Sequence, residues 1–317
     1  RTRTYSIGRD EDMIKTILPG KTIGIIGGGQ LGRMIAISAK EMGYKIAILD
    51  PSDECCAKIF SNKFIKANFD DFERIEELCQ YSDVITFEFE NIDSDLLAEL
   101  EKDYHIVQSA SLLKTAQHRL LEKEFARSLG IETVDYQYVD GDTTGVQVDG
   151  TYLMKTVRFG YDGKGQSRIT EASQVQPYTL LERLVPLDKE ISVVAYKDRT
   201  GIGIVAVVEN EHRNNILYRS IVPTTASPEQ EAQAIDYTRR ILEAADYYGV
   251  LTVEFFISQG RVIFNEMAPR VHNSGHITMQ SANKSQFRAH IEAICGLEVG
   301  PIQNQATTLY NILGQDL

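Results

Sequence analysis

The stretch that decides the fold is VLTVEFFISQGRVIFNEMAPRVHNSGH, which spans Val250–His276. It contains two apolar runs, Val250–Ile257 and Arg261–Phe264, separated by a short polar turn that ends in Gly260. Apolar runs on either side of a glycine-containing turn are typical of a β-hairpin. We therefore expect two antiparallel strands here, followed by a polar segment rich in side chains that bind anions or protons.

Two acidic residues are placed symmetrically about that turn, because Glu254 lies six residues before Gly260 and Glu266 six residues after it. In a hairpin centred there, the two carboxylates oppose each other, roughly 5 Å apart. Buried carboxylates need a counter-ion. Mg²⁺ is commonly held by one or two carboxylates plus substrate phosphates, and Asn265 adds an oxygen ligand. The hairpin is thus interpreted as a Mg²⁺ site, the alternative being a surface hairpin whose carboxylates face water.

Composition limits the classes of function. With 317 residues, 43% of them hydrophobic, the chain can form two or three domains. A net charge of −12 argues against general nucleic-acid binding. No apolar run approaches the ~20 residues that span a bilayer, and the four cysteines lack metal-ligand spacing, so we expect a soluble cytoplasmic protein with reduced thiols. His272 and His276 have helical spacing, but the Asn-Ser-Gly between them predicts a loop rather than a zinc site.

Near the N-terminus, Lys21–Pro51 has the pattern of a strand, a glycine-rich turn, an amphipathic helix and a second strand. Gly27, Gly29 and Gly32 match G-x-G-x-x-G, and Asp50 follows 18 residues after the last of them. This spacing is typical of dinucleotide-binding units. Its physical basis is general, because glycines allow backbone amides to approach an anion at a helix N-terminus. An NAD-dependent oxidoreductase therefore has to be considered.

The βαβ pattern continues beyond this unit. We expect strands at Phe64–Ala67 and within DVITFEFENI, a helix near Ser94–Lys102 and a short strand at His105–Gln108. Together these elements predict a parallel sheet of about four or five strands. A single long helix, Ser111–Leu129, is predicted to follow.

The segment Tyr152–Gln166 combines a strand with a glycine-rich loop. Lys155 lies on the strand, and Gly160, Gly163 and Gly165 follow it. Glycines let backbone amides fold over a polyphosphate, and the lysine supplies a point charge beside it. The alternative is a glycine-rich hairpin with a solvated lysine. The Walker A pattern is absent, so this is not a P-loop.

A second nucleotide element is predicted at LLERLVP, Leu180–Pro186. There, Glu182 is placed on an edge strand from which it can hydrogen-bond an adenine amino group, and the Leu184 backbone is available beside it. Glu190 is placed to accept ribose hydroxyls. Each of these could also be an ordinary surface residue. Their order along the chain favours a nucleotide site: lysine strand, glycine flap, glutamate-led hinge, then two metal carboxylates.

This order of motifs resembles the ATP-grasp superfamily and, within it, the N5-carboxyaminoimidazole ribonucleotide synthetases of purine biosynthesis. The motifs that carry the resemblance are GGGQLGRM, ITFEFENI, RLLEKEF, FGYDGKGQ, ENEHRNNIL, TVEFF and NEMAPRVHNSGH. The resemblance implies an α/β and α+β fold: an N-terminal parallel Rossmann-like preATP-grasp domain, then an ATP-grasp domain. It divides the chain into a leader-like segment (1–20), the first domain (21–112), the second domain (113–300) and the start of a largely missing small β-rich C-terminal domain (301–317).

The resemblance also implies a set of site residues. The implied Mg²⁺ ligands are Glu254 and Glu266. The implied ATP contacts are Arg119, Lys155, Gly160, Tyr161, Asp162, Gly163, Lys164, Gly165, Gln166, Glu182, Arg183, Leu184, Val185, Glu190, His212, Asn265 and Glu266. The implied substrate contacts are Gln30, Leu31, Glu88, Asp162, Lys164, Arg270, His272 and Asn273. The implied catalytic residues are Asp162, Lys164, Arg270 and His272.

The implied reaction is the ATP- and bicarbonate-dependent carboxylation of 5-aminoimidazole ribonucleotide through carboxyphosphate, with release of ADP and phosphate. Arg270 is interpreted as the bicarbonate or carboxyphosphate binder, and Asp162 or His272 as the group that takes the amine proton. The family implies a cytoplasmic homodimer with small-molecule substrates and neither nucleic-acid nor membrane partners. The alternatives are a formate-dependent glycinamide ribonucleotide transformylase, another ATP-grasp ligase, the NAD-dependent oxidoreductase and a non-catalytic nucleotide-binding module.

Overall fold

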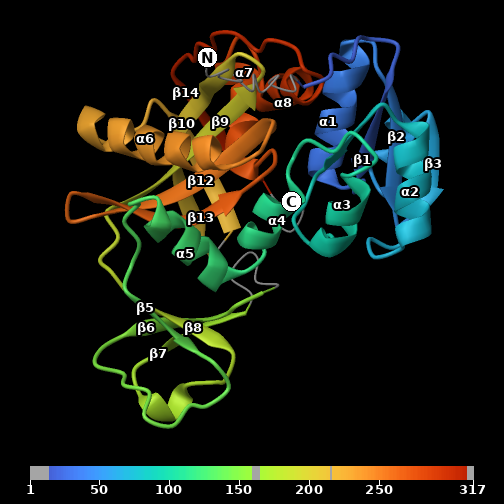
Figure 1. Ribbon diagram of the computed structural model, residues 1–317. Coiled ribbons are helices and arrows are strands. Elements are labelled where there is room, and N and C mark those ends of the chain that lie inside the picture. Colours follow the sequence, from blue (N-terminus) through green and yellow to red (C-terminus); the bar gives the residue numbers. More distant parts are fainter. Residues whose placement is uncertain (1–13, 159–164, 215, 313–317) are drawn as a thin grey trace, which may run out of the picture.

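The computed structural model describes residues 14–158, 165–214 and 216–312. In this part of the chain the strands form three sheets: a four-stranded sheet β3-β2-β1-β4, a four-stranded sheet β5-β8-β6-β7 and a six-stranded central sheet β13-β12-β9-β10-β11-β14. Figure 1 shows the N-terminal sheet with its helices on one side of the central sheet and the small β5–β8 sheet below it. No described helix is long and apolar enough to cross a membrane.

The N-terminal sheet is parallel throughout, as predicted. Its two inner strands are buried almost end to end, as is usual where helices cover both faces of a parallel sheet. The fifth strand expected at His105–Gln108 is reduced to one bridge between Ile85 and Ile106. The elements are β1 (Thr22–Ile26), α1 (Gln30–Glu41), β2 (Lys45–Asp50), β3 (Lys63–Lys66), α2 (Phe72–Tyr81), β4 (Val84–Phe87) and α3 (Ser94–Leu100).

The single helix predicted over Ser111–Leu129 is wrong, because the chain forms two helices, α4 (Ala110–Ala116) and α5 (Arg119–Ser128). His118 between them has an extended backbone, with φ −132° and ψ 105°. Neither glycine nor proline marks this break, so the hydrophobic periodicity of the sequence predicts one continuous helix. The break has a functional consequence: Arg119 becomes the first residue of a helix that packs against β13.

The small sheet consists of β5 (Tyr136–Val139), β6 (Tyr152–Thr156), β7 (Gln166–Ile169) and β8 (Thr179–Arg183). It was expected to place Glu182 on an edge strand. That expectation is wrong, because β8 pairs with β5 on one side and β6 on the other. The edge-strand interpretation overlooked the pairing of β8 with β5, from which residues 140–178 separate it in the sequence.

The central sheet is antiparallel and is covered on both faces. The helix α6 (Pro228–Ala244) packs on one face, and α8 (Gln286–Ile294) lies on the other, between β12 and α1. One hydrophobic core therefore joins the N-terminal sheet to the central sheet, with Ile35, Val194 and Phe287 among its members. The strands are β9 (Lys189–Asp198), β10 (Gly201–Arg213), β11 (Ile216–Val222), β12 (Gly249–Ser258), β13 (Arg261–Ala268) and β14 (Thr307–Tyr310).

The start of α6 is determined locally. Ser227 caps the helix by accepting a hydrogen bond from the Gln230 amide, and Pro228 occupies the first turn. The helix ends at Ala244, after which the backbone is extended. This end lets Tyr247 turn inward, where it is fully buried and donates to the Val250 carbonyl at 2.5 Å.

The hairpin predicted at the outset is present as β12 and β13. Its turn has only two residues, Gln259 and Gly260, with φ of 51° and 81°. Positive φ at both central positions is the geometry of a type I′ turn. Glu254 pairs with Glu266, as expected, but only because a β-bulge inserts Asn265 into β13. Without the bulge, the regular register of a two-residue turn would place Glu254 opposite Asn265.

Candidate functional site

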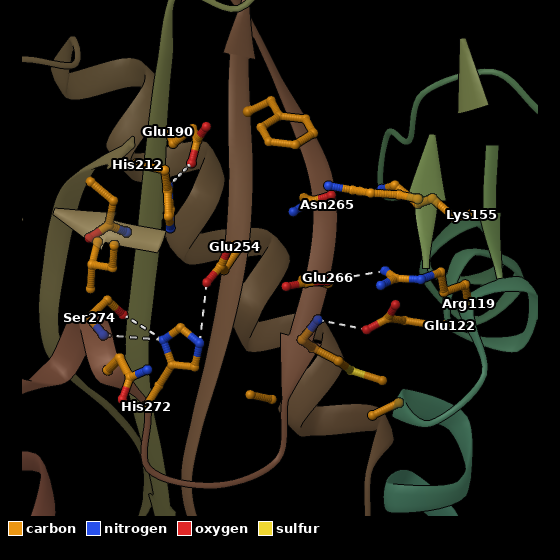
Figure 2. A pocket seen from close by; sticks show the side chains of 18 of the residues that line it. Arg119, Glu122, Lys155, Glu190, His212, Glu254, Asn265, Glu266, His272 and Ser274 are labelled. Carbon is orange, nitrogen blue, oxygen red and sulfur yellow. Dashed lines mark hydrogen bonds and ion pairs between the residues drawn. The ribbon is translucent and has the colours of Figure 1, made fainter. Parts of the chain in front are cut away.

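A pocket of about 860 Å³ lies where the three sheets approach one another. Side chains from the small sheet, from the central sheet and from the segment after β13 line it (Figure 2), and the N-terminal part contributes Gln30 on α1 and Glu90 after β4. Among the described residues that we had assigned to the site, those lining the pocket are Gln30, Arg119, Lys155, Gln166, Glu182, Arg183, Leu184, Val185, Glu190, His212, Glu254, Asn265, Glu266, Arg270, His272 and Asn273.

Five of the assigned residues lie outside the described part of the chain, namely Gly160, Tyr161, Asp162, Gly163 and Lys164. The residues on either side of this gap are described. The Gly165 carbonyl accepts a hydrogen bond from the Thr156 amide at 2.8 Å, and Lys155 pairs with Gln166 in the β6–β7 ladder. The ends of the glycine-rich segment are therefore anchored on the strand that carries Lys155.

Figure 2 shows Glu254 and Glu266 on neighbouring strands at the floor of the pocket. Burial, and then the charge of Glu266, raise the pKa of Glu254 above its ordinary value. The Oδ1 atom of Asn265 is buried and has no hydrogen-bond partner among the described residues. Two carboxylates and one amide oxygen, with a surplus of negative charge, form a donor set that suits Mg²⁺.

Basic groups flank this acidic pair without neutralising it completely. Arg119 Nη1 lies 3.2 Å from Glu266 Oε2, and His272 Nε2 lies 3.3 Å from Glu254 Oε1. The described residues contain no cluster of three or more histidine, cysteine or acidic side chains that could enclose an ion alone. A metal ion here therefore needs oxygen atoms from a bound substrate to complete its coordination, as Mg²⁺ does in phosphoryl-transfer sites.

Beside the acidic pair, Glu182 is enclosed by two lysines. Lys155 Nζ lies 2.6 Å from Glu182 Oε2, and Lys123 Nζ lies 3.4 Å from Oε1. Although burial by itself raises it, the charges of Lys123 and Lys155 lower the pKa of Glu182 to about 2. The sequence reasoning missed Lys123. Its spacing of four residues from Arg119 on one helix was the available signal.

The residues expected at the nucleotide base and ribose lie along one side of the pocket. Glu190 Oε2 and His212 Nδ1 are 2.5 Å apart on the adjacent strands β9 and β10. Burial lowers the pKa of His212, but the hydrogen bond that His212 donates to Glu190 and the charge of Glu190 outweigh that effect and raise the pKa. The Leu184 amide donates to the Thr151 carbonyl at 3.0 Å, so this N–H is already engaged within the protein.

The backbone amides of the glycine-rich turn before α1 also donate hydrogen bonds to acceptors within the protein. The Gly28 amide donates to Asp50 Oδ2 at 2.8 Å, and the amides of Gly29 and Gly32 donate to the two oxygens of Glu88, the latter at 2.5 Å. Gly27 is required here, because its φ is +98° and a Cβ atom would collide with the Glu88 side chain. The expected approach of a substrate phosphate to these amides is thus not available while Glu88 holds them.

This arrangement also argues against the oxidoreductase alternative. In dinucleotide-binding units, the acidic residue after the second strand contacts the nucleotide ribose. Here Asp50 is only 8% exposed and accepts hydrogen bonds from the amides of Gly28 and Ser52. Of the neighbouring substrate candidates, Gln30 is exposed at the pocket and Leu31 is half-buried.

Arg270 follows β13 and contacts the N-terminal part of the chain. Its Nε and Nη2 atoms lie 2.6 and 2.5 Å from Glu90 Oε2, and its Nη1 donates to the Val271 carbonyl at 3.0 Å. Glu90 was not among the assigned residues. Its position in FEFEN, two residues after Glu88 and just beyond the end of β4, was the only signal for it. The ion pair joins the two sheets across the pocket.

His272 is held in one orientation. Its Nδ1 accepts a hydrogen bond from the Ser274 amide at 3.3 Å, so the neutral ring carries its proton on Nε2, facing Glu254. Burial, and then the charge of Arg270, lower the pKa of His272 to about 3. The loop expected after it is a short 3₁₀ helix, Asn273–Ile277, which His272 caps. The acceptor nitrogen of His272, Nδ1, is therefore already engaged within the protein.

Comparison with known proteins agrees with this geometry. Residues 20–117 match the ribonucleotide synthetase preATP-grasp domain family, and residues 124–287 match the ATP-grasp domain family. The chain is 39% identical to the N5-carboxyaminoimidazole ribonucleotide synthase of Brucella melitensis biotype 1, over 96% of this chain and 89% of that protein.

Solved structures give the same result. The structure of N5-carboxyaminoimidazole synthetase from Staphylococcus aureus complexed with ADP has a TM-score of 0.90 and 36% identity, covering 95% of this chain and 85% of that one. The Aspergillus clavatus synthase in complex with ADP and 5-aminoimidazole ribonucleotide has a TM-score of 0.80 and 26% identity, with coverage of 88% and 77%. The chain therefore belongs to the N5-carboxyaminoimidazole ribonucleotide synthase family, with a preATP-grasp domain followed by an ATP-grasp domain.

Proposed function

We propose that this protein carboxylates 5-aminoimidazole ribonucleotide to N5-carboxyaminoimidazole ribonucleotide in purine biosynthesis, using ATP and bicarbonate and releasing ADP and phosphate. The observation that carries the proposal is the opposition of Glu254 and Glu266 in a pocket that also holds Lys155 and Arg270. This combination brings a site for a metal-bound polyphosphate next to a guanidinium that can bind a planar oxyanion.

ATP is proposed to bind between the small sheet and the central sheet. Lys155 lies beside the phosphates, and Arg119 lies beside Glu266 at the phosphate end. The glycine-rich flap expected from the sequence to cover the phosphates falls at residues 160–164, outside the described part of the chain. The other nucleotide contacts are those assigned from the sequence. Glu182 supports the adenine proposal in a modified form: within the described residues its buried Oε1 atom accepts no hydrogen bond, with Lys123 Nζ as an ion-pair partner 3.4 Å away, so it can accept one from the adenine amino group.

The described oxygen donors fit magnesium. Glu254 and Glu266, with Asn265 beside them, would hold Mg²⁺, which would supply charge neutralisation for the transferring phosphoryl group. The protein contributes two further features to that step. Lys155 offers a positive charge from β6, and the pocket wall excludes water from an intermediate that water would destroy.

Arg270 is proposed to hold bicarbonate, and then carboxyphosphate, beside the ribonucleotide amine. Bicarbonate oxygen attacks the γ-phosphorus of ATP, ADP leaves, and the resulting carboxyphosphate delivers its carboxyl carbon to the amine as phosphate leaves. Glu90 holds the Arg270 guanidinium in place. Of the two groups proposed to take the amine proton, Asp162 now has the stronger support, because the acceptor nitrogen of His272 is already engaged.

The ribonucleotide is proposed to lie on the N-terminal side of the pocket, near Gln30, Leu31 and Glu88. Because Glu88 is anchored by two backbone amides, its carboxylate is held rigidly at the mouth of the glycine-rich turn. An anchored carboxylate suits ribose hydroxyls better than a phosphate, which it repels. Asn273 and Lys164 complete the proposed substrate contacts, and a cytoplasmic homodimer stays a prediction.

A substrate-omission assay tests this function. ADP release is measured with ATP and Mg²⁺ in the presence or absence of the aminoimidazole ribonucleotide and of bicarbonate, and the carboxylated product is identified by mass. We expect fast turnover only when both are present. Turnover of glycinamide ribonucleotide with formate, in place of this reaction, would support the transformylase alternative and overturn the proposal.

A further inference from the structure

A chain of buried polar groups connects the central sheet to the N-terminal sheet behind the pocket. The Val250 amide donates to His290 Nδ1 at 3.1 Å, and Nε2 of the same ring lies 2.7 Å from Thr86 Oγ1. Thr86 Oγ1 donates to Gln108 Oε1 at 2.5 Å, and Gln108 Nε2 donates to the Pro269 carbonyl at 3.0 Å. The side chains of His290, Thr86 and Gln108 are completely inaccessible to solvent.

The direction of every hydrogen bond in this chain is determined. Because Nδ1 of His290 accepts from a backbone amide, the neutral ring carries its proton on Nε2 and donates it to Thr86. Thr86 has a single hydroxyl proton, which goes to the Gln108 carbonyl oxygen, so the Gln108 amide nitrogen faces Pro269 as a donor. Burial lowers the pKa of His290 to about 3, which keeps the ring neutral at physiological pH.

Two members of this chain of hydrogen bonds lie next to two proposed substrate contacts. Thr86 is on β4, two residues before Glu88, and Pro269 immediately precedes Arg270. On the pocket side, the same two segments are joined by the ion pair between Glu90 and Arg270. The segment that carries Arg270 is thus tied to the end of β4 from both sides.

We propose that His290, Thr86 and Gln108 are positioning residues, which fix the separation between Glu88 and Arg270 and so align the ribonucleotide amine with the carboxyl donor. This inference rests on the proposed function. None of the three residues lines the pocket, so they act only through the backbone they hold. Loss of this series of hydrogen bonds should therefore lower kcat/KM for the ribonucleotide much more than it weakens binding of the nucleotide, which contacts other segments.

The variant Thr86→Val tests the proposal, because it keeps the side-chain shape and removes the hydroxyl. We expect kcat/KM for the ribonucleotide to fall at least about tenfold, since a displacement of about 1 Å can cost a hundredfold. The Kd for ADP should stay within about twofold. Amide hydrogen exchange across residues 269–273 should become faster. Thr86→Ser, which restores the hydroxyl, should recover most of the activity.

Thr238→Val is the matched control. Thr238 is fully buried on α6, and its hydroxyl donates to the Ala234 carbonyl at 2.9 Å, away from the pocket. It should lose comparable thermal stability while keeping wild-type kcat/KM and wild-type exchange across residues 269–273. If the two valine variants change activity and exchange equally, the three residues have only a structural role and the proposal is overturned.

A double-mutant cycle distinguishes one connected chain from separate contacts. If Thr86 and Gln108 act in series, Thr86→Val combined with Gln108→Met should lose no more kcat/KM than the more damaging single variant. If the two losses in kcat/KM multiply instead, Thr86 and Gln108 act independently, which would contradict a single connected series. If the wild-type protein does not turn over the ribonucleotide at all, the proposed function fails, whereas hydrogen exchange across residues 269–273 still decides whether the chain holds that segment.

Discussion

The glycine-rich turn before α1 and the β12–β13 hairpin each bring two acidic side chains together, but their negative charges are compensated in different ways. At the turn, the carboxylates of Glu88 and Asp50 receive hydrogen bonds from backbone amides of the same turn. At the hairpin, Glu254 and Glu266 face each other, and burial together with their mutual repulsion raises the pKa of Glu254. The first region is complete without a ligand, whereas the second is electrostatically incomplete and is stabilised by whatever cation binds there.

The prediction with the largest expected effect concerns the acidic pair of the β12–β13 hairpin. Glu266→Gln removes one negative charge from the hairpin while keeping a side chain of the same shape. We expect ribonucleotide-dependent ADP release to fall by about two to three orders of magnitude, because charge stabilisation of a phosphoryl transfer is worth several kcal/mol. The ligand-free protein should unfold at an unchanged or higher temperature, since the repulsion is relieved.

Glu132→Gln is the control for that variant. Glu132 forms an exposed ion pair with Arg261 at the far end of the same hairpin. Surface pairs of this kind contribute little, so activity and stability should stay close to those of the wild type. Near-normal ADP release by Glu266→Gln would remove the proposed metal site.

The second prediction concerns Glu182, an acidic residue of the pocket whose charge is neutralised by neighbouring lysines. Lys123→Met leaves Glu182 with Lys155 alone in a region where Lys123 and Glu182 side chains are 2% and 5% exposed. Breaking a buried ion pair typically costs about 3 kcal/mol, so the free energy of unfolding in urea should fall by that amount. Lys21→Met, which breaks an exposed pair with Asp83, should cost about 0.5 kcal/mol or less. If Lys123→Met and Lys21→Met lost equal free energy of unfolding, the distinction between the buried and the exposed ion pair would be contradicted.

The third prediction tests whether the turn depends on its carboxylate. Glu88→Gln replaces one acceptor oxygen by an amide group, so one of the amides of Gly29 and Gly32 loses its partner. An unsatisfied buried N–H costs about 2 kcal/mol, and the free energy of unfolding should fall by about that much. Glu41→Gln, on the exposed end of α1, serves as the control. A Glu88→Gln protein as stable as the wild type would show that the turn does not need the charge.

The smallest predicted effect is a pH dependence at the hairpin. A carboxyl whose pKa is raised in the folded state binds more protons there than in the unfolded chain, so its contribution to stability falls as pH rises above its ordinary value of 4.5. Without nucleotide or metal, the wild type should therefore lose about 1 kcal/mol relative to Glu254→Gln between acidic and neutral pH. Urea unfolding of both proteins across this range measures the difference, which should be absent if Glu254 ionises normally.

Much of the fold could be predicted because its signals are local. The alternation of apolar runs with glycine-rich turns predicted the parallel N-terminal sheet, and two apolar runs on either side of the turn that ends in Gly260 predicted the hairpin. The helix break at His118 could not be predicted, because no glycine or proline marks it. The internal position of β8 was also missed, since its partner β5 is supplied by a distant segment.

The site shows the same division between local and distant causes. The acidic pair was predicted from its spacing about Gly260, but the pairing of Glu254 with Glu266 depends on the bulge at Asn265, which the symmetric interpretation did not include. Lys123 and Glu90 were missed because each acquires its role from a partner more than 50 residues away in the sequence, Glu182 and Arg270 respectively.

By itself, the sequence determined which residue types stand at which spacing: the two hairpin glutamates, the lysine before a glycine flap and the polar segment after β13. Short-range backbone preferences and side-chain periodicity are enough for that, and they place the chain in its family. Only the tertiary structure decided which charges are neutralised and which are left for a ligand. That outcome depends on burial and on contacts between distant segments, such as Glu88 with its turn amides and His290 with Thr86, because the energy of a charge or a hydrogen bond is determined by its surroundings.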